Sequence, residues 1–563
     1  MKNYKKYIAV LLTAVLLIGI FAGCSKSEES YDFIYPFSAD VNSYDPQVAS
    51  TADEFLIIEN TFEGLVRVND DGEVVSGVSD KWEISDDGLT YTFHIPEGLK
   101  WDINTDKYTD GDNKGKYKDE RLQMLGKEFN PDITADDFVF ALQRAADPIT
   151  QCPSFALISC IKNANAVHNG SMSKESLGVK SLNDNVLEIT LEHKDETFMS
   201  TLSSAVAMPC NEEFFNATKG RYGLSTKYTL FNGQFYLDQI LESSYLLKKN
   251  KYYKGPSPTK AKELTLKIPN DDEKKDIISK LESGYYDAAF ISGHDSDNVK
   301  KNSGVTYTDY CDTMWAFIFN SNDEAFQSKS LRAAFCEGFS HPDDFGKDYI
   351  TNAVNLVPSS CLISGNNAVS AIGATRPAHN TDESIKDWQK ALSVLETTNI
   401  EAVILTPDYM QDYVKMLIQG IQSGLGTSLK DEDGNTVTLT LKVEAMNEDD
   451  IKTSIAMNDY DIAFLPFKAN DSSAFSFLNQ IIDSDLGDFD RDKAEEYITL
   501  AQNESTLAET ATQLRNAERE IITTYTVCPA VYESSYYACA KGVENVQFHI
   551  GSGRVSFVNA TRK

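Results

Sequence analysis

Helical and strand patterns alternate along residues 310–530, and this alternation limits the fold more than any other feature of the chain. At 410–421, apolar residues recur on one helix face, and a strand of alternating polarity follows at 437–443. The same reasoning predicts helices at 493–501 and 507–522 and an apolar strand at 527–532. Such alternation favours an α/β layer in which a sheet is sandwiched by helices.

Short strands separated by tight turns occupy residues 63–101. The turns at 69–72 and 86–88 both end in Asp-Gly, a pair that supplies the positive φ required by tight hairpins. The strands that these turns separate are predicted at 65–68, 74–75, 82–84 and 90–95. We expect this segment to form an antiparallel meander.

A polar insertion at 104–131 precedes a well-marked helix. Thr134 and Asp137 have the spacing of a capping box, and Pro148 predicts the end of the helix. Part of the insertion is similar to a calcium loop, but Lys114 occupies a ligand position and Arg121 stands where the bidentate acid belongs. We therefore predict no metal site there.

The N-terminus carries an export signal. Three lysines precede an apolar run at 8–22, which is shorter than the roughly 20 residues of a spanning helix. Cys24 after Ala-Gly resembles a bacterial lipobox, which implies cleavage after residue 23 and lipid attachment at Cys24, with 24–30 as a flexible leash. The alternative is ordinary signal cleavage near Ala22. Both predict a location outside the cytoplasm, and the lipobox predicts anchoring to the outer face of the cytoplasmic membrane.

Charge and cysteine content exclude some classes. The formal net charge of −33 repels nucleic acid, so we predict no nucleic-acid partner. Nine cysteines in 563 residues are far below the density of a disulfide scaffold. The predicted local bridges are Cys152 with Cys160 and Cys528 with Cys539, and free buried thiols are the equally weighted alternative.

Catalytic signatures are missing from the sequence. It contains no G-x-S-x-G, H-E-x-x-H, Walker or G-x-G-x-x-G motif, and its seven histidines are scattered singly. Gly551-Ser552-Gly553 fails the last of these patterns because Ser556 stands at its third glycine position. We predict that the protein is not an enzyme and carries no cofactor.

Several segments resemble, in order and spacing, the solute-binding proteins of peptide and related ABC importers, the family that contains the oligopeptide-binding lipoproteins. The most specific stretch runs from Thr61-Phe62-Glu63-Gly64-Leu65 to Ile95. The other matching segments are Asn42–Gln47, Ile133–Phe140, Asn232–Phe235, Lys249–Tyr253, Ser283–Asp287, Phe319-Asn320, Leu331–Phe335 and Tyr460–Ala463. The resemblance spans nearly the whole mature chain.

This resemblance implies a two-lobed periplasmic-binding-protein-like fold of type II, with mixed sheets flanked by helices, an extra domain on lobe one and a hinge of two crossing segments. The implied divisions are a signal peptide at 1–23, a leash at 24–30, lobe I at 31–55, 198–308 and 532–563, the extra domain at 56–197, and lobe II at 309–531. It also implies a membrane-embedded permease as partner, and we expect a monomer.

Cleft residues follow from matched positions. Peptide binders of the family commonly read G-W-x-x-D after the Tyr-Asp position, with the Asp holding the ligand α-ammonium, whereas this chain reads Pro466-Phe467-Lys468-Ala469-Asn470-Asp471. An amide thus replaces the charge partner, and Asp471 can substitute if the loop is displaced by one residue. The expected ligand-binding residues are Asp40, Val41, Trp315, Phe467, Lys468, Asn470, Asp471 and Tyr532. For Val41 and Trp315 the alternative is a place in the core, and for Asp40 and Tyr532 a place at the surface.

The resemblance predicts an extracytoplasmic lipoprotein that captures oligopeptides in a closing cleft and delivers them to an ABC importer. Because the usual acid is missing, the alternative ligand is a different solute, either an oligosaccharide or a metal chelate. A surface peptide sensor and a tethered hydrolase are the readings from other functional classes.

Overall fold

The computed structural model describes residues 31–563 except 70–71, 126–127, 196, 256–257, 275, 299–303, 344, 364, 396–398, 426–429, 431–433, 435, 437, 505 and 551–553. The predicted signal peptide, the lipid-attachment residue Cys24 and the leash lie outside the described residues. Within them, no helix combines the length and apolar character that a membrane crossing requires.

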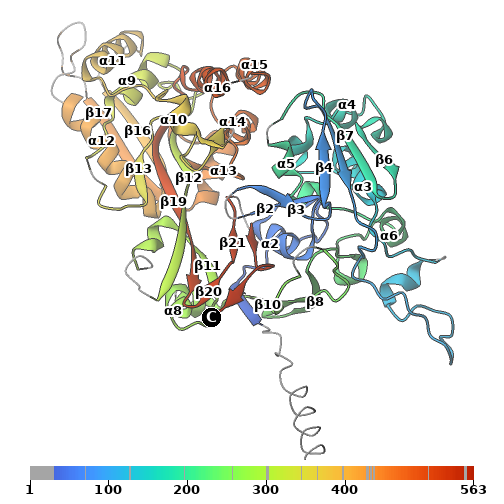
Figure 1. Cartoon of the computed structure of the whole chain (residues 1–563). Coiled ribbons are helices and arrows are strands. Elements are labelled where there is room, and N and C mark those ends of the chain that lie inside the picture. The colour runs from blue at the N-terminus through green and yellow to red at the C-terminus, as the bar shows by residue number, and fades with distance from the viewer. Residues whose placement is uncertain are drawn as a thin grey trace, which may run out of the picture.

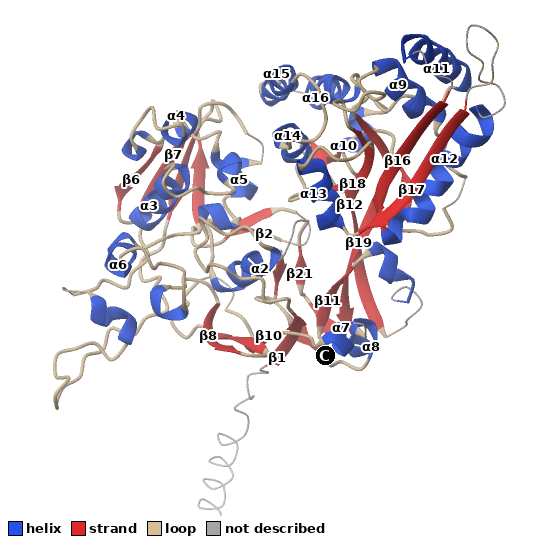
Figure 2. Ribbon diagram, turned by 180° about the vertical axis from the view of Figure 1, so that it is seen from behind, coloured by secondary structure: helices blue, strands red, loops and turns tan. Residues whose placement is uncertain are grey.

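Three main sheets form the molecule (Figures 1 and 2). Lobe I contains a four-stranded sheet in the order β1-β10-β9-β8, with bounds Tyr31–Pro36, Ala261–Lys267, Ser244–Lys249 and Phe235–Leu241. The extra domain contains β4-β5-β7-β6, with bounds Lys81–Ile84, Thr90–His94, Val186–Thr190 and Val179–Asn183. Both sheets lie in the half of the molecule that carries the N-terminus.

Lobe II is built on a seven-stranded mixed sheet. Its order is β11-β19-β12-β18-β16-β17, and β13 pairs with β19; the bounds are Ala288–Ile291, Val527–Ala540, Val305–Phe319, Ile462–Lys468, Asn399–Pro407, Thr438–Met446 and Ile350–Asn352. Neighbours of β16 run parallel to it, whereas β12 and β19 are antiparallel. This mixed arrangement confirms the predicted fold class.

Helices cover both faces of the lobe II sheet, and a hydrophobic core lies on each side of it. On one face are α9 (Lys329–Gly338), α11 (Thr381–Leu395) and α12 (Gln411–Leu425). On the other are α10 (Ala368–Ile372), α13 (Glu448–Ala456), α14 (Ala474–Asp483), α15 (Arg491–Gln502) and α16 (Leu507–Ile522). The predicted helices at 410–421, 493–501 and 507–522 are confirmed. All 14 residues of β19 are buried, which explains its unbroken apolar pattern at 527–532 and its extension beyond it.

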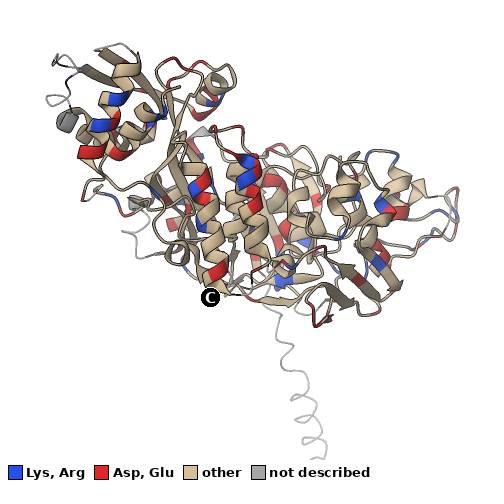
Figure 3. Ribbon diagram, turned by 90° about the horizontal axis from the view of Figure 1, so that it is seen from above, with Lys and Arg blue, Asp and Glu red and all other residues tan. Residues whose placement is uncertain are grey.

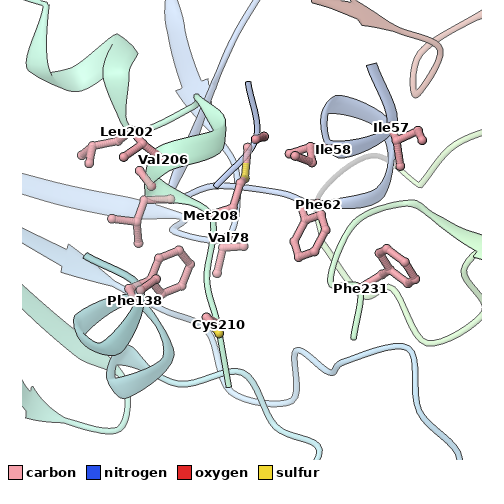
Figure 4. Close-up of a cluster of buried hydrophobic side chains, with 14 of the residues drawn as sticks. Ile57, Ile58, Phe62, Val78, Phe138, Leu202, Val206, Met208, Cys210 and Phe231 are labelled. Carbon is pink, nitrogen blue, oxygen red and sulfur yellow. The ribbon is translucent and has the colours of Figure 1, made fainter. Parts of the chain in front are cut away.

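The extra domain and lobe I share one core. Its members come from α2 (Ala52–Thr61), α3 (Ala135–Ala146) and the strands around them. Figure 4 shows Phe62, Phe138, Leu202 and Met208 within this cluster. The predicted division at residue 56 falls inside the continuous helix α2, so the boundaries of the extra domain stay a prediction.

The helix α3 begins as its sequence predicts. Thr134 is the N-cap residue, and the capping box with Asp137 is present. The chain turns away at Asp147, one residue before Pro148. Acidic and basic residues are interspersed over both halves of the molecule (Figure 3).

The predicted meander at 63–101 is wrong as a single sheet. The strands exist, but β2 (Val66–Val68) and β3 (Val74–Ser76) form a separate two-stranded sheet, and β4 with β5 joins the extra domain. A strand pattern shows where hairpins form but not which sheet each hairpin enters, because the β5 partner β7 lies about 95 residues further along the chain.

The predicted disulfide bridges are also wrong. The eight cysteines within the described part of the chain are free thiols, as the alternative expected. Cys528 and Cys539 lie near opposite ends of β19. At about 3.3 Å per residue they are roughly 36 Å apart, whereas a bridge needs Cα atoms within about 7 Å.

The remaining helices are α4 (Ala164–His168), α5 (Phe198–Thr201), α6 (Glu212–Thr218), α7 (Asp271–Lys274) and α8 (Ile277–Glu282). The remaining strands are β14 (Leu362–Ile363), β15 (Asn366–Asn367), β20 (Val543–Glu544), β21 (Gln547–Phe548), β22 (Val555–Ser556) and β23 (Thr561–Arg562). Short 3₁₀ helices lie at Glu120–Met124, Phe155–Ile158, Lys174–Ser176, Ala205–Ala207, Thr226–Tyr228, Gly293–Asn298 and Asp408–Met410.

Candidate functional site between the lobes

The chain passes between the lobes along β12 and β19, which lie side by side. Their pairing extends from Val305 with Ala540 to Ile318 with Val527. At the lobe I end of this strand pair, β11 pairs with β19. Just before β11, the Asp287 carboxylate accepts the N–H of Ile34 in β1 at 2.7 Å. The opposite end is embedded in the lobe II sheet, so bending of this strand pair would move one lobe against the other.

The register of the two strands shifts between Cys311 and Thr313 and again between Trp315 and Ala316. Such irregularities bend strands and interrupt the ladder. The first shift lies just before β12 begins to pair with β18, and the second lies within that pairing. The crossing strands are therefore irregular where they enter the lobe II sheet.

Buried acids cluster at this point. Asp312 is 1% exposed and accepts hydrogen bonds from Ser535 Oγ at 3.0 Å and Thr313 Oγ1 at 2.9 Å. Glu533 on β19 accepts the Trp315 indole N–H at 2.8 Å. Lys468 Nζ lies 3.9 Å from Asp312 Oδ2, the outer limit of an ion pair.

Burial dominates the electrostatics of this cluster. It raises the pKa of Glu533 to about 7, with Trp315 opposing the shift and Asp312 adding to it. Burial also raises the pKa of Asp312, against the attraction of Lys468. The hinge thus holds carboxyl groups whose loss of hydration is only partly offset by nearby hydrogen bonds and positive charge when they ionise.

The C-terminal hairpin β21–β22 connects to both lobes. On the lobe I side, the Asn60 amide donates to Val555 O and accepts the Phe557 N–H, both at 2.8 Å. Towards the hinge, Tyr310 Oη donates to Phe548 O at 2.8 Å, and Ile550 packs in the lobe II core. Residues next to the hairpin tip therefore lie at the inter-lobe face.

Asp471 lies at the same face on the lobe II side. Its Oδ1 accepts the Ser473 N–H at 2.7 Å, just before α14. Burial raises the pKa of Asp471. Hydrogen bonds from Ser473 and Ser476 and the charge of Arg554, next to β22, oppose the shift, and Asp195 of the extra domain adds to it.

The other residues of the predicted loop differ in exposure. Asn470 is exposed, whereas Phe467 is 4% exposed and packs in the lobe II core. Lys468 lies over the Phe290 ring at 4.4 Å. Only part of the loop therefore reaches solvent between the lobes.

Asp40 and Val41, predicted on the first strand, lie beyond its end at Pro36, on lobe I. Asp40 is exposed and its N–H donates to Asp53 Oδ2 at 2.8 Å. Val41 is half-buried against the lobe I core. Neither residue is brought next to the Asp471 loop by a recorded contact, so their ligand roles stay predictions.

Trp315 and Tyr532 lie in the two cores of lobe II. Trp315 is 1% exposed and stacks on Phe464 with ring centroids 5.4 Å apart. Tyr532, for which the surface was the alternative, is 4% exposed and donates to the Asn355 side-chain oxygen at 2.6 Å. Their ligand roles stay predictions.

Sequence reasoning missed Arg554, Asp195, Asp312 and Glu533. Arg554 directly follows Gly551-Ser552-Gly553, a turn signal that drew attention only as a failed nucleotide motif. The other three are acids among many, with no local pattern to distinguish them. Among the described residues, no group of three or more His, Cys, Asp or Glu side chains is arranged to hold a metal.

Two lobes that are joined by paired crossing strands, with polar groups of both lobes at the interface, define the class of solute-binding proteins that close around a ligand. The model of the bacterial extracellular solute-binding proteins, family 5 (Middle), matches residues 73–337. This match covers just under half of the chain, and together with the relatives described next it supports the solute-binding family of peptide ABC importers.

Individual relatives agree with this match. The dipeptide-binding protein DppE of Bacillus subtilis is 27% identical over 294 residues, which cover 52% of this chain and 49% of the relative. The probable deoxycholate-binding periplasmic protein YgiS of Escherichia coli is 30% identical over 230 residues, covering 40% and 38%. The chain spans about half the length of the curated relatives that it matches.

The fold extends over nearly the whole chain. The peptide-bound structure of Listeria monocytogenes OppA superposes with a TM-score of 0.69 at 19% identity, covering 95% of this chain and 99% of that one. The predicted two-lobed fold is confirmed.

Proposed function

We propose that this protein captures oligopeptides in the inter-lobe cleft and delivers them to the permease of an ABC importer, with no catalysis of its own. The observation that supports the proposal is the two-lobed fold joined by the paired strands β12 and β19, which superposes on the peptide-bound Listeria OppA structure. Closure would be a two-state change that a ligand favours by contacting both lobes.

Asp471 is our candidate for the ligand α-ammonium. Asn470 is uncharged, whereas Asp471 is buried enough for an ion pair to be worth more than at the surface. The peptide main chain would complete its hydrogen bonds by strand pairing, which tolerates many sequences. Asp40, Val41 and Lys468 would line the cleft, and Trp315, Phe467 and Tyr532 would support its walls.

The setting that we propose follows from the N-terminal pattern. The protein would be exported, acylated on Cys24 and held as a monomer at the outer face of the cytoplasmic membrane, away from nucleic acid. The permease would recognise the closed form. The domain boundaries given above belong to this proposal.

The test begins with mass spectrometry of whatever co-purifies with the protein, followed by titration calorimetry with the peptides identified. Asp471→Asn should weaken binding about 10- to 100-fold, the equivalent of one charge-assisted hydrogen bond. The neighbouring Asn470→Ala serves as the matched control and should change affinity less than about threefold.

N-acetylated peptides sharpen the assignment. Without the ammonium, the wild type and Asp471→Asn should bind equally. A larger loss in Asn470→Ala than in Asp471→Asn would move the ammonium contact to Asn470. Failure of every peptide to bind would refute the peptide assignment.

A second candidate is a receptor for another solute. Asn470 removes the usual charge partner, and YgiS, a relative, is named for deoxycholate binding. Calorimetry with a bile salt, an oligosaccharide and a metal chelate in place of peptide distinguishes the two candidates.

A further inference from the structure

A small cavity lies in lobe I between the end of α2, strand β2 and the C-terminal hairpin, which are neighbours at the centre of Figure 1. Its volume is about 30 Å³. A single water needs about half of that space. Its polar lining includes Glu59, Glu63, Arg67, Gln234 and Arg554.

Several buried polar atoms around this cavity lack a hydrogen-bond partner within the described part of the chain. Gln234 is 3% exposed, and both its Oε1 and its Nε2 are unpaired. Arg67 Nη1 is unpaired, and Glu63 Oε1 makes an ion-pair contact with Arg67 Nε at 3.2 Å. The Tyr253 hydroxyl lies beside both Glu63 and Gln234 and interacts with both. Because buried unpaired groups are costly and rare, this set points to a bound molecule.

Two asparagines hold these side chains in place. Asn232 clamps Glu63, accepting its N–H at 3.0 Å and donating to its carbonyl at 2.7 Å. Asn250 donates its N–H to Gln234 O at 2.7 Å and its side-chain amide to Gly233 O at 2.9 Å. Both residues that face the cavity are therefore fixed through their backbones, so the site is preformed rather than a packing accident.

The charges around the cavity cancel. Two glutamates, whose pKa values are raised by burial against the attraction of the arginines, face two arginines. His549, also in the lining, is neutral because burial lowers its pKa to about 3. A cation would meet the arginines, and an anion would meet the glutamates. A neutral group that both donates and accepts hydrogen bonds suits the site best.

The unpaired atoms specify that group further. Glu63 Oε1 and Gln234 Oε1 accept, whereas Gln234 Nε2 and Arg67 Nη1 donate. A primary carboxamide offers the complementary set, two N–H donors and one carbonyl acceptor, and it can pair with an amide such as that of Gln234 through two parallel hydrogen bonds. A hydroxyl or an apolar group would leave some of these atoms unpaired.

We propose that this cavity is a subsite for the side-chain carboxamide of a glutamine or asparagine in the bound peptide, with Gln234 as its pairing partner. The inference rests on the proposed function, since the peptide brings the group to the cavity. His549 lines the cavity and the next residue, Ile550, packs in the lobe II core, so the cavity adjoins the inter-lobe face.

The test is calorimetry with alanine peptides that carry one glutamine, or methionine as a near-isostere, at each position in turn. At one position the glutamine peptide should bind the wild type at least tenfold more tightly than the methionine peptide. Gln234→Met should abolish this preference and leave the all-alanine peptide unaffected. Gln239→Met, an exposed change on β8, is the matched control and should retain it.

Absence of the preference in the wild type, or its persistence in Gln234→Met, would overturn the subsite while leaving the peptide function intact. If no peptide binds, the proposed function fails, and acetamide alone then tests the cavity. Crystals soaked in acetamide should show it paired to Gln234 in the wild type and not in Gln234→Met. Water alone in the soaked wild-type cavity would overturn the subsite independently of peptide binding.

Discussion

The hinge and the sheet of the extra domain carry similar charged side chains in opposite surroundings. In the extra domain, Lys180 and Glu188 pair at 2.7 Å with the lysine 61% exposed. At the hinge, Lys468 approaches Asp312 only to 3.9 Å, and the acid is 1% exposed. Ion pairs exposed to water contribute little to the free energy of unfolding. Buried acids with weak partners make that free energy depend on pH.

The largest expected effect is on the pH dependence of the whole protein. Burial raises the pKa of Asp137, Glu518 and Glu533 to about 7, so the folded state holds protons that the unfolded chain releases. The contribution of these acids to stability should therefore fall as pH rises from about 4 to about 7 and change little above it. Each of these acids contributes about 1.4 kcal/mol per pH unit below 7.

Two histidines oppose this trend. Burial lowers the pKa of His341 to about 4 and that of His549 to about 3, so their contribution to stability is lost as pH falls below about 6.5. At pH 6 each of the two histidines lowers the free energy of unfolding by about 1 kcal/mol. Together with the three acids, the protein should therefore be about 2 kcal/mol more stable at pH 6 than at pH 8. Urea unfolding at pH 6 and pH 8 measures it, and greater stability at pH 8 would contradict the account.

The next effect comes from the hydrogen bond at the hinge acid. Trp315→Phe removes the donor to Glu533 and should cost about 1–3 kcal/mol at pH 8, where the carboxylate is charged. The loss should shrink at pH 5.5, where Glu533 is protonated. Trp82→Phe on β4 is the matched control in the extra domain, and its loss should not depend on pH; equal losses at both pH values in Trp315→Phe would contradict the comparison.

A smaller change isolates Glu533 itself. Glu533→Gln keeps the shape of the side chain and removes its titration, so the stability difference between pH 6 and pH 8 should shrink by about 1 kcal/mol. Paired urea titrations of the wild type and the variant measure the difference. An unchanged slope would show that Glu533 is already charged in the folded protein at pH 6.

The smallest effect is expected in the extra domain. Lys180→Gln breaks the pair with Glu188 and should change the free energy of unfolding by less than about 0.5 kcal/mol at either pH. Urea unfolding at high salt should reduce even this difference, because salt screens exposed charges. A decrease in the free energy of unfolding of more than about 1 kcal/mol would contradict the contrast between the extra domain and the hinge.

Local signals in the sequence predicted local structure well. The capping box at Thr134 and the helix at 507–522 follow from residues within a few positions of each other. The pairing of β5 with β7 and the approach of Arg554 to Asp471 join distant segments, and no local pattern encodes them. The candidate site was therefore predicted only where a family motif covered it, as in the loop of Asn470 and Asp471.

Small-angle X-ray scattering tests the central claim, that two lobes close over a ligand, most directly. The protein would be stripped of bound peptide by unfolding and refolding, then measured with and without the peptide identified by mass spectrometry. We expect the radius of gyration to fall when peptide is added and to stay constant with an Asp471→Asn variant at the same peptide concentration. An unchanged radius in the wild type, with calorimetry showing saturated binding, would contradict closure.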